Sequence, residues 1–148
     1  MNRNDLASGQ DLDANARTPD RPIADLAKVL VVGRSQINRV VVAKIVERSG
    51  LKTISESPDT AMAMLRKMAP GTIILDGGSD NKDCDALMAP IMSLRQASGT
   101  NLPSVILLSN RPGTPESLSL SSAVDIVVAK PITPERLQPV VDKLVGRA

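Results

Sequence analysis

The chain has 148 residues, of which 42% are hydrophobic and 23% are charged, and its formal net charge is +2. These values suit one globular domain, and the charge is too small to indicate nucleic-acid binding. One cysteine, no histidine and no aromatic residue exclude an internal disulfide framework, histidine-based catalysis and stacking on nucleic-acid bases. No apolar run approaches the ~18 residues of a membrane span. We therefore expect a cytoplasmic protein that binds neither nucleic acid nor membrane.

The N-terminal segment differs in composition from the rest of the chain. Residues 1–27 are mostly polar and show no hydrophobic periodicity. Such a segment cannot bury enough apolar surface to offset the entropy lost on folding. We predict a disordered tail over residues 1–27, followed by one folded domain over residues 28–148.

Five short runs typical of strands follow. Four are apolar, as in strands buried on both faces, whereas residues 52–55 are half polar, as in an edge strand. Stretches with helical spacing of apolar residues lie between them. This alternation predicts an α/β fold with a parallel sheet and helices on both faces. One helix should be short or mobile, because the Leu-Ser-Leu-Ser-Ser run at 118–122 is poor helix material. The strands are expected at 28–32, 52–55, 72–76, 103–108 and 125–129, and the helices at 36–49, 58–69, 86–97, 114–122 and 134–145.

The third strand runs directly into Asp76, which two glycines follow. Parallel strands place their C-terminal tips at one edge of the sheet, where sites are built. A carboxylate, a hydroxyl, a lysine and an arginine are expected to meet at this edge. The other strands that end in distinctive residues contribute Gly33 and Arg34, Ser109 and Lys130.

This combination of side chains suits the handling of a phosphoryl group. A carboxylate can act as the nucleophile. A lysine and a hydroxyl can hold the transferred oxygens. A magnesium ion held by carboxylates and water normally supplies the remaining positive charge.

The chain resembles the receiver domain of bacterial response regulators over Lys28 to about Val145. The resemblance rests on the order and spacing of several segments, rather than on one motif. It implies a flavodoxin-like, doubly wound five-stranded sheet with strand order 2-1-3-4-5. The matching segments are 28–32, 73–76, 106–109 and 127–131.

The resemblance also implies roles for individual residues. Asp76 stands at the phosphoacceptor position, Ser109 is the hydroxyl that senses the phosphoryl group, and Lys130 is the invariant lysine of the family. The implied partner is a histidine kinase, a phosphotransfer protein or another signalling protein, and a homodimer is also open.

The chain departs from the family where the metal ion is held. The family has two acidic residues after its first strand, and this chain has Gly33 and Arg34 there. Only Asp76 and a backbone carbonyl, expected at Gly78, remain as metal ligands, so magnesium should bind weakly if at all. Two hypotheses for Arg34 stay open. Its side chain points into solvent, or its guanidinium lies against Asp76 and replaces the metal, as an always-charged bidentate donor can.

Three functional hypotheses follow. The favoured one is a stand-alone, non-enzymatic receiver with a degenerate site that acts by docking onto a partner. The second is a fully active phosphorelay receiver that is phosphorylated on Asp76. The third is a small flavodoxin-like ligand binder with a phosphate loop at residues 77–79, which the lone Gly-Gly pair and the lack of aromatic residues disfavour.

Overall fold

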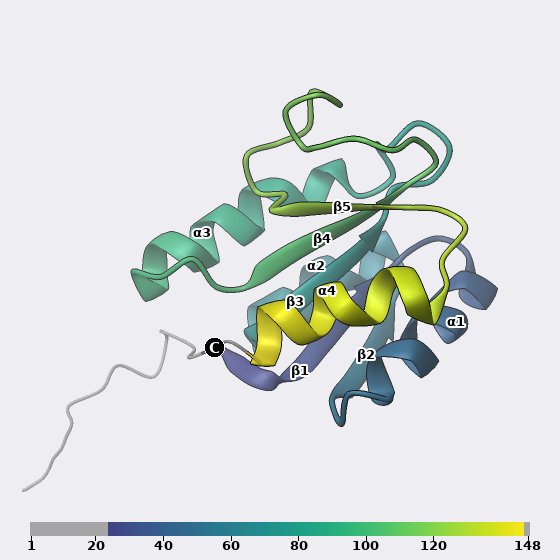
Figure 1. Ribbon diagram of the computed structural model, residues 1–148. Coiled ribbons are helices and arrows are strands. Elements are labelled where there is room, and N and C mark those ends of the chain that lie inside the picture. The colour runs from purple at the N-terminus through teal and green to yellow at the C-terminus, as the bar shows by residue number, and fades with distance from the viewer. Residues whose placement is uncertain (1–23, 147–148) are drawn as a thin grey trace, which may run out of the picture.

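A five-stranded parallel sheet forms the centre of the protein (Figure 1). The computed structural model describes residues 24–146. The strand order β2-β1-β3-β4-β5 confirms the predicted flavodoxin-like topology. The strands are β1 (Asp25–Val32), β2 (Lys52–Glu56), β3 (Pro70–Asp76), β4 (Ser104–Ser109) and β5 (Ile126–Ala129).

Helices cover both faces of the sheet, as expected for a doubly wound fold. One hydrophobic cluster lies under α1 (Gln36–Glu47) and α4 (Pro134–Gly146), and a second lies under α2 (Pro58–Lys67) and α3 (Met88–Ser98). A short 3-10 turn, η2 (Asp85–Leu87), precedes α3. In Figure 1, α4 lies in front of the sheet and α2 behind it. Within residues 24–146, none of the helices is both long and apolar enough to cross a membrane.

The central strand β3 is buried along its whole length. Its side chains alternate between the two faces, so that Ile73 and Leu75 pack under α2 and α3, whereas Ile74 packs under α1 and α4. Successive side chains of a strand point to opposite faces. Because both faces are covered here, β3 is largely apolar, with Thr72 as a buried polar residue, until it ends at Asp76.

The first strand begins earlier than the sequence predicts. Residues 25–27, which the sequence predicts to be part of the tail, belong to β1. Asp25 pairs with Pro70 of β3, and its N–H donates to the Ala69 carbonyl at 2.8 Å. Their exposed, partly polar character hides the strand, because backbone pairing rather than burial of side chains holds this end. The rest of the predicted tail lies outside the described residues, apart from Ala24.

The predicted helix over 114–122 is wrong, because these residues form turns. The described residues therefore contain four α-helices rather than the five we expected. The Thr114 and Ser117 side chains each accept a hydrogen bond from the other residue's backbone N–H, at 3.0 and 2.8 Å. Ser119 adopts a positive φ of 56°. The reciprocal bonds between Thr114 and Ser117 are those of a helix start, but the chain leaves the helical region at Ser119, so no helix continues beyond this turn.

Candidate functional site

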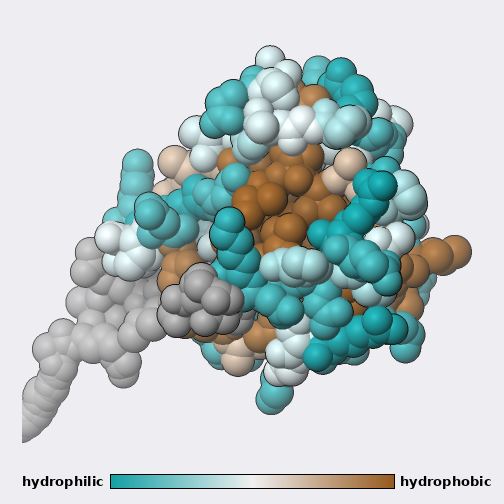
Figure 2. All heavy atoms as spheres, viewed as in Figure 1, coloured by the Kyte–Doolittle hydropathy of each residue, from teal (hydrophilic) through white to brown (hydrophobic). Residues whose placement is uncertain are grey.

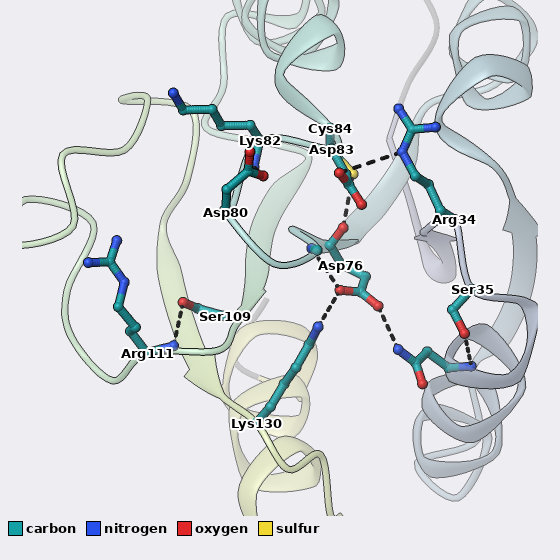
Figure 3. Close-up of polar contacts among 12 residues, drawn as sticks. Arg34, Ser35, Asp76, Asp80, Lys82, Asp83, Cys84, Ser109, Arg111 and Lys130 are labelled. Atoms are coloured by element: carbon teal, nitrogen blue, oxygen red, sulfur yellow. Dashed lines mark hydrogen bonds and ion pairs between the residues drawn. The ribbon is translucent and has the colours of Figure 1, made fainter.

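The candidate site is built around the Asp76 carboxylate, at the C-terminal tip of β3. Asp76 is 6% exposed. Its Oδ1 accepts hydrogen bonds from Lys130 Nζ at 2.7 Å and from the Gly78 N–H at 3.1 Å (Figure 3). Its Oδ2 accepts a hydrogen bond from Asn38 Nδ2 at 3.0 Å. The carboxylate is therefore paired with one cation and held by two further donors.

The β5 strand delivers Lys130 to this site. Lys130 directly follows β5, and its N–H donates to the Ser109 carbonyl of β4 at 2.8 Å. This bond continues the pairing of β4 with β5 beyond the end of the strand. The ammonium group thus reaches Asp76 from across β4, as the sequence predicts for residues at the tips of parallel strands.

Arg34 does not replace a metal beside Asp76, so that hypothesis is wrong. Its guanidinium lies beside Asp83, with Nε 3.5 Å from Oδ1, and its side chain is 64% exposed. Figure 3 shows it reaching toward Asp83 rather than the Asp76 carboxylate. The backbone of Gly33 faces Asp76 instead, because a Cβ added there would lie 2.9 Å from the Asp76 Cβ. The chain can pass this close to Asp76 only where it has no side chain.

Asn38 belongs to the site, although the patterns in the sequence did not predict it. It lies in the first turn of α1, the helix that directly follows β1. Ser35 caps this helix, and its hydroxyl accepts a hydrogen bond from the Asn38 N–H at 3.2 Å. The place of Asn38 in the chain could have indicated this role, because a helix that starts right after a parallel strand has its first turn at the same edge as the strand tips.

Ser109 lies at the same edge, but its hydroxyl is hydrogen-bonded to the backbone rather than to Asp76. Its Oγ accepts a hydrogen bond from the Arg111 N–H at 3.0 Å (Figure 3). The side chain is fully buried. Among the described residues, the hydrogen-bond donors to the Asp76 carboxylate are Lys130, Asn38 and Gly78, so Ser109 is a neighbour rather than a partner of Asp76.

The surroundings of Asp76 favour its ionised form. Burial by itself would raise the pKa of Asp76. Hydrogen bonds from Lys130, Asn38 and the Gly78 N–H outweigh this effect, and the pKa of the carboxyl lies below its ordinary value of 3.8. Asp76 is therefore a carboxylate at neutral pH, and Lys130 balances its charge.

The single cysteine packs against the same strand tip. Cys84 is 1% exposed, and its thiol donates to the Asp76 carbonyl at 3.4 Å. Burial, followed by the nearby carboxylates of Asp76 and Asp83, raises the pKa of the thiol to about 12. A thiol with so high a pKa is not a nucleophile at neutral pH, so Cys84 is a packing residue.

Solved structures share this architecture, although comparisons with family models and with curated proteins found no match. The chemotaxis response regulator CheY4 of Vibrio cholerae is 21% identical over 80% of this chain and 98% of that chain, with a TM-score of 0.64. A response regulator from Thermotoga maritima is 20% identical over 80% and 97%, with a TM-score of 0.62. This chain has the fold of a response-regulator receiver domain.

A third structure with the receiver fold bears on the metal. The receiver domain of a sensor histidine kinase from Pseudomonas aeruginosa is 17% identical over 81% of this chain and 98% of that chain, with a TM-score of 0.64. That domain has a magnesium ion coordinated in its active-site cleft. A magnesium ion needs oxygen ligands in nearly octahedral geometry, commonly including one or two carboxylates.

The residues of this chain fit magnesium poorly. Residues 24–146 contain no group of three or more His, Cys, Asp or Glu side chains that could hold a metal ion. Gly33 has no side chain, and Arg34 lies against Asp83. Both oxygens of Asp76 already accept hydrogen bonds. The donors around Asp76 therefore suit a hydrogen-bonded carboxylate better than a magnesium ligand.

The glycine loop after β3 does not form a phosphate cradle. The Gly78 N–H is used by Asp76. A Cβ added at Gly78 would overlap the Asp83 carboxylate. An anion in this loop would lie beside the carboxylates of Asp76 and Asp83, which would repel it. The loop therefore does not support the ligand-binder hypothesis.

An apolar surface adjoins the site on α1. Ile37 is 76% exposed, Val40 47% and Val41 41%. Figure 2 shows apolar residues protruding at the edge of the molecule where α1 lies in Figure 1. Beside them is a cavity of about 300 Å³ that opens onto the Asp76 carboxylate. Its lining includes Asn38, Val41, Asp76, Lys130, Pro131 and Ile132.

Proposed function

We propose that this chain is an atypical receiver protein of two-component or phosphorelay signalling, which acts by docking onto a signalling partner. The Asp76–Lys130 pair carries this proposal, because it stands at the strand tips of a receiver fold. The role is not enzymatic. The poor fit for magnesium supports a site with weak or no magnesium-dependent phosphorylation.

We place the docking surface on α1, at Ile37, Val40 and Val41 (the α1 face). Large apolar side chains with such exposure mark interaction sites when they lie together. The cavity beside the α1 face is lined partly by Val41 and reaches Asp76 and Lys130. A partner residue inserted there would touch the charged pair while its neighbours cover the apolar side chains. The chemistry fits a histidine kinase or phosphotransfer protein with an apolar docking helix.

Replacing Ile37 with Asp should weaken this docking at least tenfold, because the charge would have to be buried against an apolar partner surface. Binding to a histidine-phosphotransfer protein can be measured by calorimetry, with Leu26→Asp as the control. Leu26 is 37% exposed and lies at the start of β1, at the opposite end of that strand from α1. Equal losses in the two variants, or none in Ile37→Asp, would place the docking surface elsewhere.

The second candidate function is an active phosphorelay receiver, which the pairing of Asp76 with Lys130 also favours. In that step Asp76 Oδ2 would attack the phosphorus of a phosphohistidine, the P–N bond would break, and the imidazole would leave with the bond's electron pair. Lys130 would stay against the negative charge of the acyl phosphate.

Phosphotransfer separates the two candidates. A phosphotransfer protein that carries ³²P on its histidine should bind the chain and transfer little label to it within minutes, with or without magnesium. We expect the Asp76→Asn variant to behave the same way. Rapid labelling of the wild type, absent in Asp76→Asn, would instead establish the active relay.

A further inference from the structure

The two oxygens of the Asp76 carboxylate have unlike surroundings. Oδ1 accepts hydrogen bonds from Lys130 and from the Gly78 N–H. Among the described residues, Asn38 is the donor to Oδ2. An ionised carboxylate can only accept hydrogen bonds, so Asn38 must present its NH₂ group to this oxygen.

A ligand that binds Oδ2 would compete with a neutral side chain, that of Asn38, whereas one that binds Oδ1 would compete with the charged Lys130. Asn38 and Asp76 line the same cavity. A proton, a cation or a phosphoryl group that takes a lone pair of Oδ2 competes with the Asn38 amide for that oxygen. Because Asn38 is neutral, its release leaves no unpaired charge behind, unlike the release of Lys130.

The release of Asn38 would act on the first turn of α1. The Asn38 N–H is bonded to the capping hydroxyl of Ser35. The next residue, Arg39, donates from Nη1 to the Gly33 carbonyl, while its Nε is buried with no hydrogen-bond partner in the described structure. A buried donor without a partner is unfavourable. We therefore expect the first turn of α1 to rearrange when the hydrogen bond between Asn38 and Asp76 is lost.

The same turn carries the α1 face. Ile37 precedes Asn38 in the chain, and Val41 lies three residues after it, on a neighbouring part of the helix surface. Both are exposed. A change in the first turn therefore changes the shape of the apolar surface on which we place the partner.

We propose that Asn38 is a positioning residue that transmits the state of the Asp76 carboxylate to the α1 face. The contact couples the two sites, and coupling of this kind is reciprocal. A change at Oδ2 alters the α1 face, and a partner bound to the α1 face alters the affinity of Oδ2 for its ligand. This inference deepens the proposed function and rests on it only for the identity of the partner.

The test is a pair of amide chemical-shift comparisons on ¹⁵N-labelled full-length chain. Asp76→Asn, compared with wild type, should shift the amide signals of residues 36–41, because it changes the group that Asn38 holds. The same substitution made in an Asn38→Ala background should shift these signals less than half as much. The Gly78 amide, which bonds directly to residue 76, should shift in both backgrounds and serves as the internal control.

Two further variants sharpen the result. Gln36→Ala removes an exposed side chain from the same turn and should leave the full response of α1 to Asp76→Asn. Asn38→Gln keeps the amide and should restore part of the response. An α1 response of equal size with and without Asn38 would overturn the proposal. The measurement uses neither partner nor phosphoryl donor, so this outcome would leave the docking proposal intact, and failed docking would leave the coupling intact.

Discussion

Replacing Lys130 with methionine should lower the free energy of unfolding at pH 7 by about 3 kcal/mol. The substitution keeps the length of the side chain but leaves the carboxylate of Asp76 without its cation. The side chains of Lys130 and Asp76 are 22% and 9% exposed, so water compensates little for this loss. Urea denaturation followed by far-UV circular dichroism measures the effect, since the chain has no aromatic residue for fluorescence.

Two controls separate the ion pair from a general effect of removing a lysine. Lys82→Met removes an exposed lysine near the same edge of the sheet and should change the stability by no more than about 0.5 kcal/mol. The double variant Asp76→Asn with Lys130→Met should recover much of the loss, because no unpaired charge remains. Additive losses in the double variant would contradict this account of the site.

The loss in Lys130→Met should also depend on pH. The pKa of Asp76 is lowered in the folded protein, so its contribution to stability is present above the ordinary value of 3.8 and is lost as the pH falls through the lowered pKa. In the variant, burial raises the pKa of Asp76 without opposition from Lys130. The stability difference between wild type and variant should therefore be largest near neutral pH and shrink as the solution becomes acidic enough to protonate Asp76. A difference that grows on acidification would contradict this sign.

Replacing Ile74 with alanine should lower the free energy of unfolding by about 2–5 kcal/mol. Ile74 is fully buried in the middle of β3, in the cluster under α1 and α4. The substitution removes apolar contacts and leaves a cavity that a sheet paired on both sides cannot easily close. Denaturation in urea, again followed by circular dichroism, checks the value.

The matched control is Ile37→Ala, because it makes the same chemical change on the α1 face. Ile37 is 76% exposed, so its loss should change the stability by no more than about 0.5 kcal/mol. The two variants thus distinguish a packing role from a docking role. Ile74→Ala should destabilise the fold, whereas Ile37→Ala should weaken partner binding without destabilising the fold. Similar stabilities of the two variants would show that β3 is less tightly packed than its burial indicates.

The architecture was predictable because it depends on repeating patterns. The apolar runs around Ile74 and in the neighbouring strands can be satisfied only in a sheet covered on both faces, and the structure confirms this. The segment 114–122 shows the limit of such patterns. Thr114 and Ser117 form the hydrogen bonds of a helix start, yet the helix does not continue past Ser119, whose φ is positive, and spacing alone does not predict that break.

The order of residues sufficed to place Asp76 and Lys130 together, because strands of a parallel sheet bring their tips to one edge and the topology leaves little choice. The tertiary structure alone decided what surrounds them. Arg34 stands just beyond the end of β1, as Asp76 stands at the end of β3, yet it lies beside Asp83, and Asn38 reaches the carboxylate instead. The direction of a side chain beyond the end of a strand depends on the path of the backbone past Gly33, on helix capping at Ser35 and on the available partners. The contacts of Gly33 and Asn38 with Asp76 join segments far apart in the chain, and no periodicity in the sequence records them.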